Sequence, residues 1–84
     1  MDLKAKIDEL ARKLTPIPDM AVLLDMEESN LRMLLINNAD LRSTYNRAKA
    51  EMALEIRERE IEMARAGSPT ASANLGSYLA QMEE

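Results

Sequence analysis

The sequence contains no cysteine, histidine, tryptophan or phenylalanine, and only two glycines and three prolines occur in its 84 residues. Without cysteine there is neither a disulfide framework nor a thiolate nucleophile, and without histidine there is no imidazole base. Zinc and haem sites of the usual kind need the same side chains. Two glycines are too few for a glycine-rich phosphate loop, and the serines lack an evident base partner. We therefore expect no catalytic activity and no cofactor.

The sequence also lacks a run of about 18 apolar residues and a basic-then-apolar leader, so it predicts no membrane span and no signal peptide. Cytoplasmic residence is the default expectation. A chain of 84 residues corresponds to one domain. Such a domain buries only about 60–65% of its unfolded surface, which makes a monomeric core marginally stable. Oligomerisation is the natural remedy.

Leucine, isoleucine, methionine and alanine dominate the apolar residues, with methionine used seven times. This composition favours helices over strands and predicts an all-α fold. Apolar periodicity and breaker residues divide the chain into five helical segments, at about residues 2–14, 18–24, 27–36, 40–66 and 69–82. We expect an N-terminal helix and helix-turn-helix unit over residues 1–39. A C-terminal helical hairpin for oligomerisation follows over residues 40–84, within one compact domain overall.

The spacing of residues 17–34 is typical of a helix-turn-helix. Apolar side chains occupy the positions that two short crossed helices bury, namely Met20, Leu24, Met26, Leu31 and Leu34. Small Ala21 lies where the two backbones approach closely. The turn position four residues later usually needs a positive φ and is commonly glycine; here it is Asp25, one of the few other residues that tolerate this conformation.

Local signals also define the ends of the last two helices. Asp40 is the expected N-cap of the long helix, and Gly67 is suited to the left-handed residue at its end. Ser68 and Pro69 are suited to be the cap and first residue of the final helix. The final helix places five apolar residues on one face: Ala71, Leu75, Tyr78, Leu79 and Met82. We read Gly76 on this helix as a contact point for a closely packed neighbour.

The long helix has two apolar faces. One stripe contains Leu41, Tyr45, Ala48, Met52, Ile56 and Met63, and the nearly opposite stripe contains Ala50, Leu54 and Ile61. The rest of the chain hardly covers both stripes, so we predict that the second stripe lies in an interface between subunits. The alternative is that the N-terminal helices fold back over it.

A third stripe of the long helix is acidic and consists of Glu51, Glu55, Glu58 and Glu62. Aligned carboxylates can bind Mg²⁺, as in all-α nucleotide pyrophosphohydrolases, which place paired acidic motifs on neighbouring helices. A second acidic pair is missing here, and Arg59 lies where it would neutralise two of the glutamates. We therefore expect a solvated, salt-bridged face and no metal site.

The order of these segments resembles a known family. A helix-turn-helix, a long charged helix beginning LRSTYNRAKAEMALEIRE and the tail EMARAGSPTASANLGSYL are together similar to the small terminase subunits of tailed phages and prophages. The resemblance covers most of residues 16–82 and is greatest in the tail. It implies a non-catalytic subunit that recognises double-stranded DNA, forms a ring or similar oligomer and presents viral DNA to the large terminase ATPase.

The candidate DNA contacts lie on the predicted recognition helix and at the start of the long helix. They are Ser29, Asn30, Arg32, Met33, Arg42, Arg47 and Lys49. Only Asp40 opposes the last three, which form a cluster suited to phosphate contacts. The net charge of −4 and the acidic pair Glu27-Glu28 work against DNA binding. The competing hypothesis is a helical protein-interaction or structural module that uses the helix-turn-helix only for packing.

Overall fold

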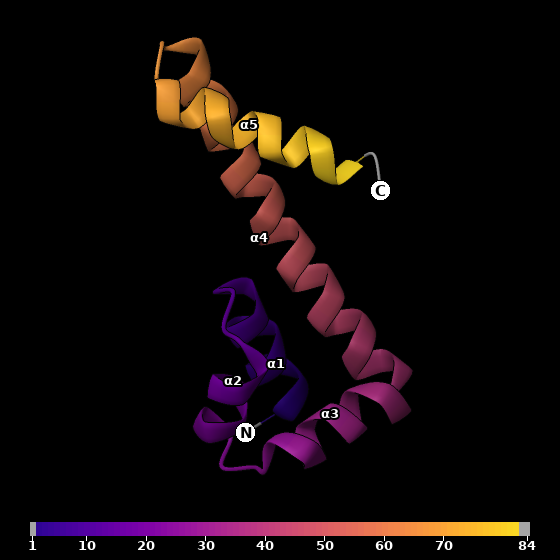
Figure 1. Ribbon diagram of the computed structural model, residues 1–84. Helices are drawn as coiled ribbons and strands as arrows, with labels where there is room; N and C mark the ends of the chain where they lie inside the picture. The colour runs from indigo at the N-terminus through magenta and orange to yellow at the C-terminus, as the bar shows by residue number, and fades with distance from the viewer. Residues whose placement is uncertain (1, 83–84) are drawn as a thin grey trace. The chain divides into compact units, whose positions relative to one another are not determined.

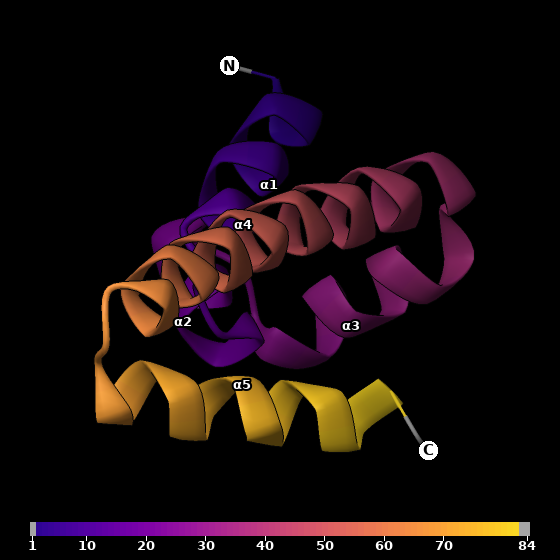
Figure 2. The same cartoon turned by 90° about the horizontal axis from the view of Figure 1, so that it is seen from above.

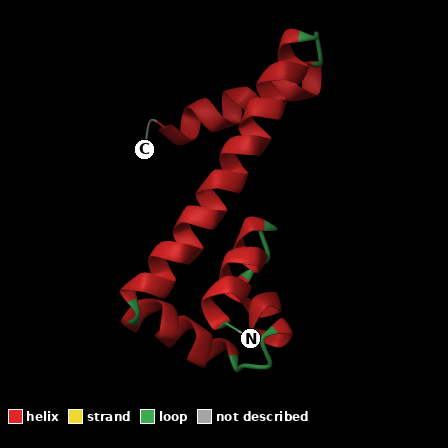
Figure 3. Cartoon of the chain, turned by 180° about the vertical axis from the view of Figure 1, so that it is seen from behind, coloured by secondary structure: helices red, strands yellow, loops and turns green. Residues whose placement is uncertain are grey.

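The computed structural model describes residues 2–82, which fold into five α-helices (Figure 1). These are α1 (Leu3–Arg12), α2 (Ile17–Leu23), α3 (Glu28–Asn37), α4 (Ala39–Arg65) and α5 (Pro69–Met82). Short loops join the helices, and no strand occurs in the described residues (Figure 3). The all-α prediction is confirmed. Within residues 2–82, no helix combines the length and apolar character that a membrane crossing needs.

The chain divides into two compact units, and the boundary lies inside α4. The first, here called the N-terminal unit, runs to Met52, and the C-terminal unit begins at Ala53. This boundary differs from the predicted one after residue 39. The reason is that Leu41 and Ala48, in the first turns of α4, belong to the core formed with α1, α2 and α3.

The core of the N-terminal unit contains eight buried apolar residues: Ile7, Ala11, Met20, Ala21, Leu31, Leu35, Leu41 and Ala48. Ile7, Met20 and Leu31 have no accessible surface at all. The partly buried Leu24, Met26 and Leu34 pack against this cluster, so the predicted packing of the helix-turn-helix is confirmed. Figures 1 and 2 show from two directions how α3 leads directly into the first turns of α4.

The turn between α2 and α3 has the predicted backbone conformation. Asp25 has φ of 58°, in the left-handed region. The N–H of the next residue, Met26, donates to the carbonyl oxygen of Ala21 at 2.9 Å and closes the end of α2. Leu14, after α1, has φ of 56° as well, which the sequence does not signal because leucine rarely adopts this conformation. Both residues redirect the chain between consecutive helices.

The predicted cap of α4 is wrong, and the predicted caps of the α4–α5 turn are confirmed. Asn38, not Asp40, caps α4: its Oδ1 accepts from the backbone N–H groups of Asp40 at 3.1 Å and Leu41 at 3.2 Å. Asparagine and aspartate are nearly equal caps, so residue type alone does not decide between Asn38 and Asp40. Gly67 has φ of 98°, and Ser68 Oγ accepts from the N–H of Ala71 at 3.2 Å.

The C-terminal unit consists of the later turns of α4 and α5. Ala71 is its one buried residue within the described chain. Leu75 and Tyr78 are half-buried, whereas Leu79 and Met82, predicted on the same face, are exposed. The predicted hairpin turn is present at Gly67, but α5 then diverges from α4 instead of packing along it (Figure 1).

Candidate nucleic-acid interface

The outer face of α3 presents the side chains that the sequence assigns to a recognition helix. Ser29, Asn30, Arg32 and Met33 are all exposed. They are exposed because Leu31 and Leu35 turn the opposite face of α3 into the core. Ile36, which the sequence interpretation did not include, is also 63% exposed on this helix. The exposed face of α3 is therefore partly polar and partly apolar.

Arg32 forms an ion pair on the exposed face of α3. Its Nε donates to Oε2 of Glu28, one turn earlier, at 2.9 Å. Both side chains remain about half exposed, so the pair is accessible and weak. A DNA phosphate would have to compete with the Glu28 carboxylate for this guanidinium.

Arg42 joins α4 to the end of α3. Its Nη1 donates to the carbonyl oxygen of Ile36 at 2.7 Å, with a longer contact of 3.5 Å to that of Leu35. These carbonyls belong to the last turn of α3, where the helix dipole is negative and a cation is favoured. Arg42 therefore has a structural role that sequence reasoning missed. No periodicity signals this contact, because it links two different helices.

Arg32 and Arg42 line one open hollow of about 270 Å³ between α3 and α4. Its other lining residues are Ile17, Leu35, Ile36, Tyr45 and Asn46. Lys49 is close to the same hollow, because its Nζ lies 5.1 Å from the ring centroid of Tyr45. The fold thus brings together three of the four predicted cations on one side of α4.

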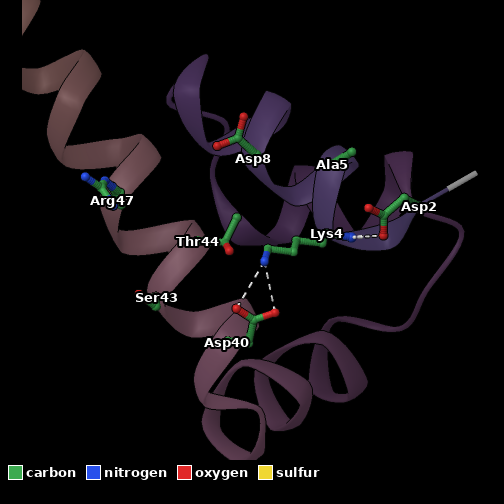
Figure 4. Close-up of a pocket in the computed structure, with 8 residues that line it drawn as sticks. All are labelled: Asp2, Lys4, Ala5, Asp8, Asp40, Ser43, Thr44 and Arg47. Carbon is green, nitrogen blue, oxygen red and sulfur yellow. Dashed lines mark hydrogen bonds and ion pairs between the residues drawn. The ribbon is translucent and has the colours of Figure 1, made fainter.

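Arg47 lies on a different side of α4, in a second hollow of about 490 Å³ that α4 forms with α1 (Figure 4). In this hollow the Lys4 ammonium pairs with the Asp40 carboxylate at 3.1 Å. Asp40, predicted to oppose the basic cluster, is thus paired with α1. Arg47 itself donates from Nε to Glu51 Oε1 at 3.1 Å. The four cations do not form the single cluster expected from the sequence.

Glu51 links α4 to α1. Its Oε2 accepts from Arg12 Nη1 at 2.9 Å, while its other oxygen accepts from Arg47. The hydrogen bond and charge of Arg12, aided by Arg47, lower the pKa of Glu51 below its ordinary value. The pKa of Arg12 is raised in turn, first by its hydrogen bond to Glu51 and then by that to Asp8. One glutamate of the predicted acidic stripe therefore serves as a bridge between helices.

The remaining side chains of the acidic stripe form no metal site in the described structure. No group of three or more acidic, histidine or cysteine side chains in residues 2–82 is arranged to hold a metal ion. Arg59, predicted to neutralise Glu55 and Glu62, forms no ion pair with either of them in residues 2–82. The ion pair within this part of α4 joins Arg47 to Glu51.

The predicted interface residues are exposed in the single chain. Ala50 is exposed, Leu54 is 55% exposed and Ile61 is 37% exposed. The opposite stripe, expected to be covered within the chain, is covered only in part: Leu41 and Ala48 are buried, but Met63 is 52% exposed. Apolar surface on the later turns of α4 is therefore uncovered on more than one side.

Comparison of the chain with protein-family models, with curated proteins and with solved structures found no match. The resemblance to small terminase subunits consequently rests on the sequence pattern alone.

Proposed function

We propose that this protein is a non-catalytic DNA-recognition subunit of a phage-type DNA packaging machine. The observation that carries the proposal is the arrangement of α2 and α3. A tight turn at Asp25 and the buried Met20 and Leu31 fix the two helices, and the outer face of α3 stays accessible. In this function Ser29, Asn30 and Arg32 meet the major groove, as the second helix of such a motif does.

The phosphate contacts in this proposal come from one side of the unit. Arg32 and Arg42 line the hollow between α3 and α4, and the ammonium group of Lys49 lies over the ring of Tyr45, which lines the same hollow. The hydrogen bonds of Arg42 to α3 use Nη1 only, so its other N–H groups are able to donate to a phosphate. Arg47 faces the other hollow and is omitted from this surface.

Self-association is the second part of the proposal. The net charge of −4 makes binding of DNA by a single copy weak. Linked copies raise the effective concentration of each contact and so multiply weak binding. By the resemblance, the partner of the oligomer is the large terminase ATPase.

The salt dependence of binding to duplex DNA tests the DNA-recognition role. Affinity should fall with a log–log slope of about −0.9 for each phosphate neutralised. Arg32→Ala and Lys49→Ala should each flatten the slope by about one unit. Arg42→Gln is preferred to alanine because glutamine keeps a donor for the end of α3. Arg47→Ala is the matched control on the other side of α4 and should leave the slope unchanged.

A charge change in the opposite direction gives an independent test. Glu28→Gln removes the charge that pairs with Arg32 and, together with Glu27→Gln, removes repulsion near the duplex. This double variant should bind nonspecific DNA more tightly than the original chain. If the intact protein binds no duplex even at low salt, the DNA-recognition role is wrong.

A protein-interaction module is the second candidate function. It is favoured by Met33 and Ile36, which are 55% and 63% exposed on α3 where a DNA-reading surface would be polar. Under this alternative, the double variant Met33→Ser, Ile36→Ser no longer captures a protein partner. Neither the original chain nor this variant binds DNA at low salt.

A further inference from the structure

The helix α5 carries no charge along its whole length. Its residues, PTASANLGSYLAQM, include no acidic or basic side chain, in a chain whose residues are 31% charged. Helices at a protein surface ordinarily place charged side chains on the face turned to water. The composition of α5 therefore indicates a helix covered on more than the one face that α4 touches.

The C-terminal unit contains an uncovered apolar groove. It lies between α4 and α5, has a volume of about 500 Å³, and is lined chiefly by Ile61, Leu75, Tyr78, Leu79 and Met82. Leu79 is 59% exposed and Met82 is 82% exposed. Arg57 lies at the edge of the groove, with its guanidinium carbon 5.0 Å from the ring centroid of Tyr78.

The C-terminal unit does not enclose a core of its own. Ala71 is its one buried side chain among residues 53–82, whereas eight buried residues fill the N-terminal core. Two helices that diverge leave their facing apolar side chains in contact with water, and a unit this small needs added burial to be stable. The groove is where that burial is missing.

We propose that a second copy of this chain fills the groove, with α5 of each copy lying in the groove of the other. The inference rests on the self-association included in the proposed function and specifies its surface. The groove and α5 belong to the same unit. In a pair of copies related by a two-fold axis, each α5 can therefore cover the groove of the other copy. Because α5 is uncharged, it brings no charged side chain of its own into the partner's groove.

The backbone of α5 also allows a close approach. At Gly76 a Cβ atom would meet no atom within 4 Å, apart from the helix's own backbone and chain neighbours, so this part of α5 is open. The contact predicted at Gly76 is therefore not made within the described chain. A partner helix has access to it. The proposed interface is centred on Leu79 and differs from the stripe of Ala50, Leu54 and Ile61, with which it shares Ile61 alone.

Two matched charge variants test the proposal on the full-length protein. Leu79→Glu places a carboxylate in the groove, and Leu54→Glu places one on α4 outside it, at nearly equal exposure of 59% and 55%. Light scattering should give at least twice the mass of one chain for the original protein and for Leu54→Glu. It should give the mass of one chain for Leu79→Glu, with the helical circular dichroism of the N-terminal unit retained.

An original protein that has the mass of one chain up to millimolar concentration overturns the proposal. Dissociation by Leu54→Glu with Leu79→Glu unaffected overturns it too, because the interface then lies on the predicted stripe. DNA binding is measured on the same samples with a short duplex. If the original protein has the mass of one chain and still binds the duplex, the shared groove is refuted while the DNA-recognition role stands.

Single cysteines provide a readout that does not depend on the glutamate variants folding. The chain has no cysteine, so Leu79→Cys and Leu54→Cys each introduce one thiol. Under mild oxidation Leu79→Cys should form disulfide-linked dimers at least tenfold faster than Leu54→Cys. Equal rates, or the reverse order, overturn the proposal.

Discussion

The two units of this chain contain similar apolar residues but bury them to different extents. In the N-terminal unit, α1, α2 and α3 share one core with the first turns of α4, and Ile7, Met20 and Leu31 lose all contact with water. In the C-terminal unit only two helices meet, and Leu79 remains largely exposed. Burial therefore depends on the number of elements that enclose a side chain, because a pair of helices always leaves one side of their contact open.

The polar contacts between helices differ in the same way. In the N-terminal unit, ion pairs join α1 to α4 at Lys4 with Asp40 and at Arg12 with Glu51. In the C-terminal unit, α4 and α5 are linked by the Asn74 amide, which donates to Glu60 at 3.2 Å, and by Arg57 over Tyr78. Exposed ion pairs stabilise a fold only slightly, so the two pairs with α1 add little to the stability that apolar burial provides.

The largest expected effect separates the two units by packing. Leu31→Ala removes a fully buried side chain from the N-terminal core and should cost about 2–5 kcal/mol in the free energy of unfolding. Leu54→Ala, at a site that is 55% exposed in the C-terminal unit, should change it by about 0.5 kcal/mol or less. Urea denaturation followed by circular dichroism measures both. Equal losses would mean that the two units are packed alike.

The next largest effect on stability comes from the backbone conformation of the turn at Asp25, which does not depend on core packing. Because Asp25 has φ of 58°, a β-branched side chain there is strained, and Asp25→Val should cost more than about 1 kcal/mol. Asp25→Gly removes the strain and should be neutral or mildly stabilising. Thermal melting of the two variants makes the comparison. Similar destabilisation by both would show that the aspartate side chain, and not its φ, holds the turn.

The smallest expected effect concerns pH. The pKa of Glu51 is lowered in the folded protein by Arg12, so its ionised form is favoured by folding. Its contribution is present above the ordinary pKa of glutamate, about 4.3, and is lost as pH falls through the lower, folded value. Glu51→Gln should therefore slightly reduce stability at neutral pH and weaken its decline on acidification.

Urea denaturation across the acidic range measures this dependence. Glu55→Gln is a suitable control on the next turn of α4, since Glu55 is exposed and outside the bridge to α1. An identical pH dependence for Glu51→Gln and the original chain would contradict the bridging role.

Much of the fold follows from the sequence because its signals are local. Periodicity places all five helices, Asp25 and Gly67 supply the two turns predicted to need positive φ, and Ser68 caps α5 as expected. The predicted cap at Asp40 is wrong by two residues, since Asn38 is as good a cap. Leu14 escapes prediction because its left-handed conformation is imposed on a residue that does not favour it.

The candidate site follows from the sequence only in part. The exposure of Ser29, Asn30 and Arg32 is a consequence of helical periodicity and is predicted correctly. The grouping of the cations is different, because Arg42 and Arg47 project to different sides of α4. Their partners, the end of α3 and Glu51, become neighbours only after the helices pack.

The helices, most of their ends and the face that each presents follow from the amino-acid sequence without knowledge of the packing. These properties depend on the residues within one or two turns, where side-chain periodicity, capping and backbone conformation act. Two features depend on how the helices pack: the N-terminal core extends into α4 as far as Ala48, and Arg42 binds the carbonyl groups at the end of α3. The packing also decides that α5 diverges to leave a groove, since such contacts depend on the angles at which helices meet, and no local pattern encodes these angles.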